Sequence, residues 1–92
     1  MQGKSYSYPI DESWNTQELE TVIAMFRQVE DAYEVGVNRQ KVLQAYRQFK
    51  KVIPAKSEEK RLGREFEKTS GYVLYRVVKK AQDSNAKRFK ME

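Results

Sequence analysis

The strongest structural signal lies in residues 14–36, which read WNTQELETVIAMFRQVEDAYEVG. Asn15 is a residue type that caps helices, and Glu18 stands three positions later, where its carboxylate can reach back to the backbone of the cap. Gly36 is a natural left-handed residue at the end of a helix. Between them, apolar residues recur every three or four positions, which predicts one long amphipathic helix. The stripe consists of Leu19, Val22, Ile23, Phe26, Val29 and Tyr33.

A second helix is predicted to begin almost at once, because Asn38 can cap it and Val37 can pack against Val42 across the cap. It ends near Pro54, since a proline ring disfavours helical backbone at the preceding residue and carries no amide hydrogen. The connection between the two helices is therefore a tight turn. The apolar stripe of this second helix consists of Val42, Ala45, Tyr46, Phe49, Val52 and Ile53.

Two further helices are predicted in the second half of the chain. Ser57 can cap the first of them, and Glu58 and Glu59 follow where the helix dipole favours negative charge. The pattern resets around Gly71, so residues 72–81 form a fourth helix or a bent continuation of the third. The apolar residues of these segments are Leu62, Phe66, Tyr72, Leu74, Tyr75, Val78 and Ala81.

The sequence thus predicts an all-α fold, a small compact bundle or array of four helices with an extended N-terminal strap. A chain of 92 residues is long enough for one hydrophobic core and too short for two. We expect a single helical domain in which residues 1–14 form the strap and residues 15–82 the helical core. Residues 83–92 lack a periodic apolar pattern and are predicted to be a flexible basic tail.

The strap contains three aromatic residues, Tyr6, Tyr8 and Trp14. Pro9 favours extended backbone at Tyr8, so the strap can lie across the helices. We interpret these side chains mainly as cover for the core, because a small helical domain must cover its apolar faces before it can expose any. The alternative is that they form an aromatic partner surface.

The composition argues against catalysis and against metal binding. The sequence contains no Cys and no His, which removes thiolate nucleophiles, disulfides, the commonest general base and the commonest transition-metal ligand. Carboxylates remain, but Glu58, Glu59, Glu65 and Glu67 alternate with basic residues in a pattern typical of surface ion pairs. We therefore expect no enzymatic activity, no cofactor and no metal.

The sequence also predicts where the protein resides. The longest apolar run, Val22 to Phe26, is far shorter than the roughly 20 residues that cross a bilayer. The first fifteen residues lack the apolar stretch of a signal peptide. Together with the lack of Cys, these features predict a cytoplasmic protein without a membrane segment.

Charge is distributed unevenly along the chain. Residues 1–37 carry two basic residues against seven acids, a net charge of −5, whereas residues 38–92 carry sixteen basic residues against six acids, a net charge of +10. The second helix has a cationic face that suits phosphate groups or an acidic partner. The simpler interpretation is that these charges are solvated or pair with the acidic face of the first helix. The cationic face comprises Arg39, Lys41, Arg47, Lys50 and Lys51, next to Gln40, Gln44 and Gln48.

Two finer hypotheses concern the start of the second helix. Arg39 and Lys41 place positive charge at the positive end of the helix dipole, so an anion bound there by free amides would relieve the conflict. Residues 28–47 also resemble a helix-turn-helix in their spacing, with Gly36 in the turn. The first helix is longer than is usual in that motif, which argues against DNA reading.

Several separated motifs occur in an order typical of a known family. They are Tyr8-Pro9-Ile10-Asp11 with Trp14, Gly36-Val37, Ala45-Tyr46 with Phe49-Lys50, Pro54-Ala55-Lys56 with Glu58-Glu59-Lys60, and Phe66-Glu67-Lys68 with Ser70-Gly71-Tyr72. On these motifs the chain, from about Tyr8 to Ala81, resembles the YktA-like uncharacterised protein family 0223 of Gram-positive bacteria. The resemblance implies a compact helical domain and no activity, ligand or site residue. The basic tail after Ala81 lies outside it.

The predicted function is that of a non-catalytic protein–protein interaction module. Its candidate contact surfaces are the aromatic strap and the opposed acidic and basic faces. A homodimer that pairs acid with base is one arrangement of this kind. The alternative is a nucleic-acid-binding accessory protein that uses the basic face of the second helix on phosphates. A carboxylate-dependent enzyme is a third and much weaker alternative.

Overall fold

The computed structural model of the chain describes residues 8–92, so residues 1–7 of the strap, Tyr6 among them, lie outside the described part. The described residues form four helices and two short strands. In chain order the elements are α1 (Thr16–Glu34), β1 (Val37–Asn38), α2 (Arg39–Val52), α3 (Lys56–Ser70), α4 (Leu74–Asp83) and β2 (Arg88–Phe89). The all-α prediction with four helices is confirmed, and the strands are an addition to it.

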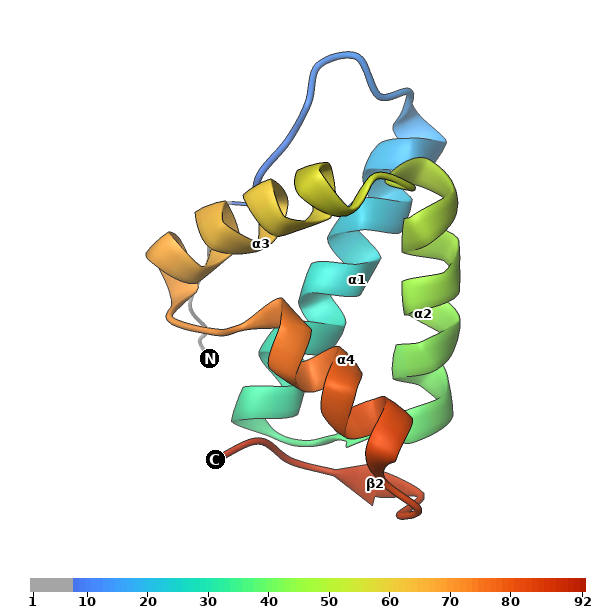
Figure 1. The fold of residues 1–92 in the computed structure, drawn as a ribbon, viewed down its shortest axis with the longest axis vertical. Coiled ribbons are helices and arrows are strands. Elements are labelled where there is room, and N and C mark those ends of the chain that lie inside the picture. The colour runs from blue at the N-terminus through green and yellow to red at the C-terminus, as the bar shows by residue number, and fades with distance from the viewer. Residues whose placement is uncertain (1–7) are drawn as a thin grey trace.

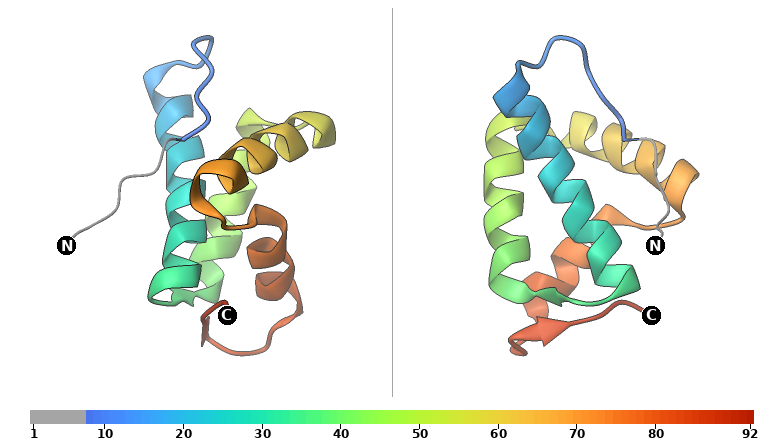
Figure 2. Two further views of the ribbon diagram at one scale, coloured as in Figure 1. Left: turned by 90° about the vertical axis from the view of Figure 1, so that its left-hand side faces the viewer. Right: turned by 180° about the vertical axis from the view of Figure 1, so that it is seen from behind.

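The helices are arranged as two pairs (Figure 1). α1 and α2 lie side by side and antiparallel, and a short turn joins them. α3 crosses one end of this pair, and α4 then returns to pack against α1 and α2. The quarter-turn view in Figure 2 shows α1 on one side of the molecule and α3 and α4 on the other. The apolar core lies between these layers.

The predicted start of α1 is confirmed in detail. The side-chain oxygen of Asn15 accepts a hydrogen bond from the amide of Glu18 at 2.8 Å, and the Glu18 carboxylate accepts one from the amide of Asn15 at 2.9 Å. At the other end, the amides of Val35 and Gly36 donate to the carbonyl of Asp31. Gly36 has a φ of 99°, which only glycine adopts readily. The buried stripe is rotated slightly from the predicted one and comprises Val22, Met25, Phe26, Val29 and Ala32.

α2 also begins and ends close to its predicted limits. The side chain of Asn38 accepts a hydrogen bond from the amide of Lys41 at 3.1 Å. The helix ends at Val52, shortly before Pro54. Its inner face and the residue that follows it bury Val42, Phe49 and Ile53, while Ala45, Tyr46 and Val52 are half-buried at the edges.

α3 begins two residues earlier than predicted. The amide of Glu59 donates to the carbonyl of Ala55 at 3.0 Å, so Ala55 is the cap residue and Ser57 lies inside the first turn. The side chain of Ala55 makes no capping hydrogen bond. The prediction that Ser57 caps this helix is therefore wrong, because the chain has already entered helical geometry at Lys56.

α3 and α4 are separate helices, which resolves the alternative left open by the sequence. Gly71 ends α3 with left-handed backbone at a φ of 80°. Tyr75, which the apolar pattern placed on the inner face of the fourth helix, is 65% exposed. The buried face of α4 consists of Leu74, Val77, Val78 and Ala81.

Phenylalanine rings from α1, α2 and α3 meet at the centre of the core. The ring centroid of Phe26 lies 4.7 Å from that of Phe66. The strap covers this cluster, because the ring of Tyr8 stacks on Phe66 at 5.9 Å and its hydroxyl donates to Glu30 at 2.9 Å. Trp14 also packs against the core. Both described aromatic residues of the strap therefore act as core cover.

Residues 83–92 differ from the flexible basic tail that the sequence predicts. β2 pairs antiparallel with β1, and Phe89 stands opposite Val37. Phe89 is buried, and the amide of Met91 donates to the carbonyl of Ala32 at 2.7 Å. A two-residue strand with one large apolar side chain has no periodicity, which is why the sequence pattern did not indicate it.

Candidate functional site

The structure divides the five basic residues that the sequence predicts as a contact surface on α2. Lys41, Arg47 and Lys51 are exposed. Arg39 instead turns toward α4, where its Nε donates to the carbonyl of Ala81 at 2.6 Å. Arg39 therefore joins two helices and does not face solvent together with the other three.

Lys50, the fifth of these residues, belongs to a polar cluster of Tyr46, Lys50 and Glu59 that joins α2 to α3. Its ammonium group lies 2.7 Å from one carboxylate oxygen of Glu59 and 3.3 Å from the carbonyl of Pro54. The hydroxyl of Tyr46 donates to the other carboxylate oxygen at 2.8 Å. Burial, followed by the hydrogen bond to Glu59 and its charge, raises the pKa of Tyr46, so the hydroxyl remains a donor. The negative charge of Glu59 is thus compensated within the molecule.

The start of α2 offers less to an anion than predicted. The amide of Lys41 donates to Asn38, and the amide of Arg39 donates to the carbonyl of Lys87 at 2.9 Å. Two of the amides that an anion would need are therefore occupied by the chain itself. α1 and α2 also lie side by side (Figure 1), whereas the helices of a helix-turn-helix cross at about 90–120°. The structure therefore supports neither an anion site at the start of α2 nor a helix-turn-helix at residues 28–47.

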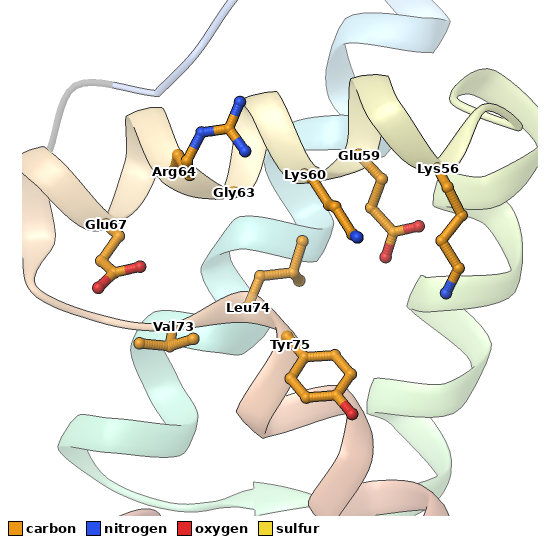
Figure 3. Close-up of a pocket in the computed structure, with 9 residues that line it drawn as sticks. All are labelled: Lys56, Glu59, Lys60, Gly63, Arg64, Glu67, Val73, Leu74 and Tyr75. Atoms are coloured by element: carbon orange, nitrogen blue, oxygen red, sulfur yellow. The ribbon is translucent and has the colours of Figure 1, made fainter.

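A groove between α3 and α4 is the site that the sequence analysis missed (Figure 3). Its volume is about 480 Å³, which lies within the range of roughly 300–1,000 Å³ typical of ligand pockets. α3 contributes charged side chains and the backbone of Gly63, and the start of α4 contributes Val73, Leu74 and Tyr75.

The narrow apolar stripe of α3 explains why this groove exists. α3 buries only Leu62 and Phe66, so one face of the helix rests on the core while the neighbouring face looks across the groove to α4. A Cβ atom added at Gly63 would meet the side chain of Leu74 at 3.8 Å. Because that is ordinary van der Waals distance, a larger side chain at residue 63 would extend into the groove and fill part of it.

The groove has an apolar floor and a rim whose two ends differ in charge. In Figure 3 the side chains of Lys56 and Lys60 extend from α3 on the same side of the groove as Tyr75. Glu67 lies at the other end of the groove. Three basic and two acidic residues line the groove, and one of those acids, Glu59, is already paired in the polar cluster. The end that contains Tyr75 is therefore positively charged.

Two features of the sequence could have indicated this groove. Tyr75 lies three positions before Val78 but directly after Leu74, about 100° further round the helix. It therefore falls at the edge of the stripe of Leu74, Val77 and Val78 and not at its centre. Gly63 stands in the interior of a charged helix, where glycine costs roughly 1 kcal/mol relative to alanine. A glycine in such a place often has a packing or functional reason.

Other parts of the described chain offer less. A hollow of about 540 Å³ runs along α1 and is lined by residues of that one helix, so it is an exposed helix face and not a cleft between elements. Within residues 8–92, no three or more acidic side chains come together in a group able to hold a metal ion. No helix of this same part of the chain is long and apolar enough to span a membrane.

Comparison with known proteins identifies relatives along almost the whole chain. Residues 5–90 match the Uncharacterised protein family (UPF0223). The chain is 57% identical over 81 residues to a UPF0223 protein of Streptococcus pneumoniae (strain CGSP14), with 88% of each chain covered. It is 53% identical over 80 residues to a UPF0223 protein of Streptococcus sanguinis (strain SK36), with 87% of each covered. The family match reaches residue 90, so it includes the C-terminal segment that the sequence resemblance left out.

Proposed function

The chain belongs to the Uncharacterised protein family UPF0223, and we propose that it is a non-catalytic protein-binding module whose docking site is the groove between α3 and α4. The observation that carries this proposal is the exposed aromatic ring of Tyr75 beside an apolar groove floor. Protein interfaces concentrate aromatic side chains of this kind near their centres, where they supply much of the binding energy.

The surroundings of Tyr75 distinguish it from the other exposed apolar residues of the described chain. Ile10 is 57% exposed and Val35 is 72% exposed. Both stand singly on segments that flank α1, and scattered apolar residues of that kind are normal on protein surfaces. Tyr75 instead lines a groove together with Leu74 and Gly63, and this arrangement supports a binding site.

The non-catalytic part of the proposal rests on the available chemical groups. The sequence has neither His nor Cys, and the carboxylate of Glu59 in the groove is held by hydrogen bonds from Tyr46 and Lys50. A carboxylate with both oxygens engaged is poorly suited to proton transfer. We place the proposed binding activity in the cytoplasm, in keeping with a composition that lacks Cys.

A homodimer formed through the groove is less favoured by the arrangement of the helices. α1 carries most of the acidic residues of the first half of the chain, and it lies on the side of the molecule away from α3 and α4 (Figure 2). A second copy that placed its acidic α1 against the positively charged groove would pair head to tail, which produces chains of molecules and not a symmetric dimer. A separate partner protein fits the groove better.

Nucleic-acid binding through α2 is the second candidate function. The observation in its favour is that Lys41, Arg47 and Lys51 are exposed on the same helix as the exposed amides of Gln40 and Gln44. Lysine and arginine on such a surface bind phosphates with little dependence on sequence, and salt weakens this binding steeply. Because Arg39 and Lys50 are engaged elsewhere, this surface is smaller than the sequence predicts.

Site-specific photo-cross-linking tests the two candidates against each other. A photoreactive phenylalanine analogue replaces Tyr75 in the groove, and in a matched control it replaces Gln44 on the exposed face of α2, in cells that naturally contain the protein. We expect protein cross-links from residue 75 that persist after nuclease treatment. Cross-links confined to residue 44 and lost after nuclease treatment would overturn the proposal and favour nucleic-acid binding.

A further inference from the structure

We infer that the groove between α3 and α4 binds an acidic, amphipathic segment of a partner protein, an inference that rests on the proposed function and specifies the partner's chemistry. The segment places an aromatic or aliphatic side chain on the groove floor and carboxylates beside the lysines of the rim. Three features of the groove carry this inference, and each constrains a different part of the segment.

The floor of the groove selects an apolar anchor. Tyr75 is 65% exposed and presents its ring at the edge of the groove. Val73 and Gly63, both half-buried, line the groove with it, and Leu74 lies beneath with only 3% of its surface exposed. An aromatic or branched aliphatic side chain removes this apolar surface from water and packs against the Tyr75 ring.

The rim of the groove selects carboxylates on one side of that anchor. The side chains of Lys56 and Lys60 extend on the same side of the groove as Tyr75 (Figure 3). Figure 3 shows the Glu59 side chain between those of Lys56 and Lys60, but its carboxylate is already paired with Lys50 at 2.7 Å. The two ammonium groups therefore favour acidic side chains of a partner and disfavour basic ones.

The opposite end of the groove sets the direction of the bound segment. Glu67 lies there, distant from Lys56 in the view of Figure 3. A carboxylate of the partner is repelled at that end and attracted at the Tyr75 end. The segment is therefore asymmetric, with its acids on the side of Lys56 and Lys60 and neutral or basic residues on the side of Glu67.

The charge of the whole molecule favours the approach of an acidic partner from this side. Residues 56–83, which include α3 and α4, carry eight basic residues against five acids, a net charge of +3, whereas the net charge of residues 1–37 is −5. α1 lies on the other side of the molecule (Figure 2). A field arranged in this way attracts an acidic segment to the groove and raises its association rate at low salt.

Two peptides of equal length test the inference with the full chain. One is a fluorescein-labelled twelve-residue peptide with a central Phe and Leu and four Asp or Glu residues on one side of them. The other replaces each acid by its amide. We expect fluorescence anisotropy to show binding of the acidic peptide, weaker binding of the amide peptide, and loss of the difference as salt rises. Equal affinity for the two peptides would overturn the inference.

Matched variants locate the binding. Lys56→Gln with Lys60→Gln should weaken binding of the acidic peptide by about tenfold, since exposed ion pairs are individually modest. Lys41→Gln with Lys51→Gln removes the same charge from the exposed face of α2 and should leave the affinity within about twofold. An equal loss in both double variants would show attraction to overall charge only and would overturn the inference.

The Tyr75→Ala variant tests the anchor. Because Tyr75 is 65% exposed, the variant should fold, and loss of the ring should weaken binding by about tenfold. Unchanged affinity, in a variant shown by circular dichroism to be folded, would contradict the proposed anchor.

Two further outcomes separate this inference from the proposed function on which it rests. Protein cross-links from residue 75, together with no acidic-peptide binding, would reject the acidic chemistry and leave the protein-binding function standing. Groove-dependent binding of a single-stranded oligothymidine, without binding of the acidic peptide, would reject both.

Discussion

The α1–α2 pair and the α3–α4 pair are built in different ways, although each consists of two consecutive helices. Asn15 and Asn38 cap the first two helices through their side chains, whereas Ala55 and Val73 begin α3 and α4 without a side-chain hydrogen bond. The first pair makes the more extensive contact and leaves only a hollow of about 250 Å³ between its helices, while the second leaves a groove of about 480 Å³. Stability is therefore concentrated in the first pair, and the surface available for binding is concentrated in the second.

Truncation of a buried aromatic ring should lower the free energy of unfolding far more than truncation of the exposed ring in the groove. Phe26 is fully buried, and its ring lies 6.0 Å from Phe49 and 4.7 Å from Phe66. Phe26→Ala should lower the free energy of unfolding by about 3–5 kcal/mol, because it leaves a cavity where three helices meet. Urea unfolding followed by circular dichroism measures this change. Tyr75→Ala in the groove is the matched comparison and should stay within about 0.5 kcal/mol of the wild type; a similar loss in both variants would refute the division of roles.

Removing a cap from α1 and adding one to α3 should change the free energy of unfolding by smaller amounts. Asn15→Ala removes the side-chain oxygen that accepts the Glu18 amide, while the backbone amide of residue 15 can still donate to Glu18. The substitution should cost about 1 kcal/mol. Ala55→Ser places a hydroxyl at the cap of α3, where the backbone already has extended geometry with φ −79° and ψ 128°, and should gain roughly 0.5–1 kcal/mol. Thermal unfolding of the two variants provides the test. A loss of stability in Ala55→Ser would show that α3 has no unused capping position.

The smallest expected effect concerns the acidic residues at the C-terminal end of α1. The last turns of α1 hold Glu30, Asp31 and Glu34 and no basic residue in the final turn, which opposes the helix dipole. Burial, and then the charge of Glu34, raises the pKa of Asp31. Because the folded-state pKa lies above the unfolded value, the ionised carboxylate destabilises the fold above that pKa, and the penalty disappears as pH falls through it.

Asp31→Asn should therefore stabilise the protein at pH 7 by roughly 0.3–1 kcal/mol. The gain should shrink as pH is lowered through the raised pKa of the carboxyl, because the wild type then becomes neutral at this position too. Urea unfolding at a series of pH values from 7 to 3 measures the trend. A gain that is independent of pH would assign the effect to packing and not to charge.

The first pair could be predicted from sequence, because its signals are local. Asn15 and Glu18 define the start of α1, and Gly36, Asn38 and Pro54 define the turn and the limits of α2. Each of these residues acts on backbone within a few positions of itself. The apolar stripes then followed from helical spacing, apart from a small rotation of the face of α1.

The rest depends on contacts between distant residues, which a pattern along the chain does not contain. The hydrogen bond from Arg39 to Ala81 spans 42 positions, and the ion pair of Lys50 with Glu59 joins two helices. Each interaction takes one cation, Arg39 or Lys50, out of the exposed basic face of α2. Helical spacing alone predicts that both belong to that face. Helical spacing from Val78 groups Tyr75 with the apolar residues of the fourth helix, whereas in the structure it lies at the edge of that stripe and is 65% exposed.

The antiparallel contact between β1 and β2 has a consequence for any attempt to shorten or extend this chain. Phe89 is buried opposite Val37, and the amide of Met91 donates to the carbonyl of Ala32 at the end of α1. A chain that ends at Asp83 would expose the turn between α1 and α2 to solvent. It would also lack the Lys87 carbonyl that accepts the hydrogen bond from the Arg39 amide. Figure 1 shows the C-terminus at the end of the molecule away from α3. An affinity tag is therefore best appended after residue 92, where it leaves the groove open.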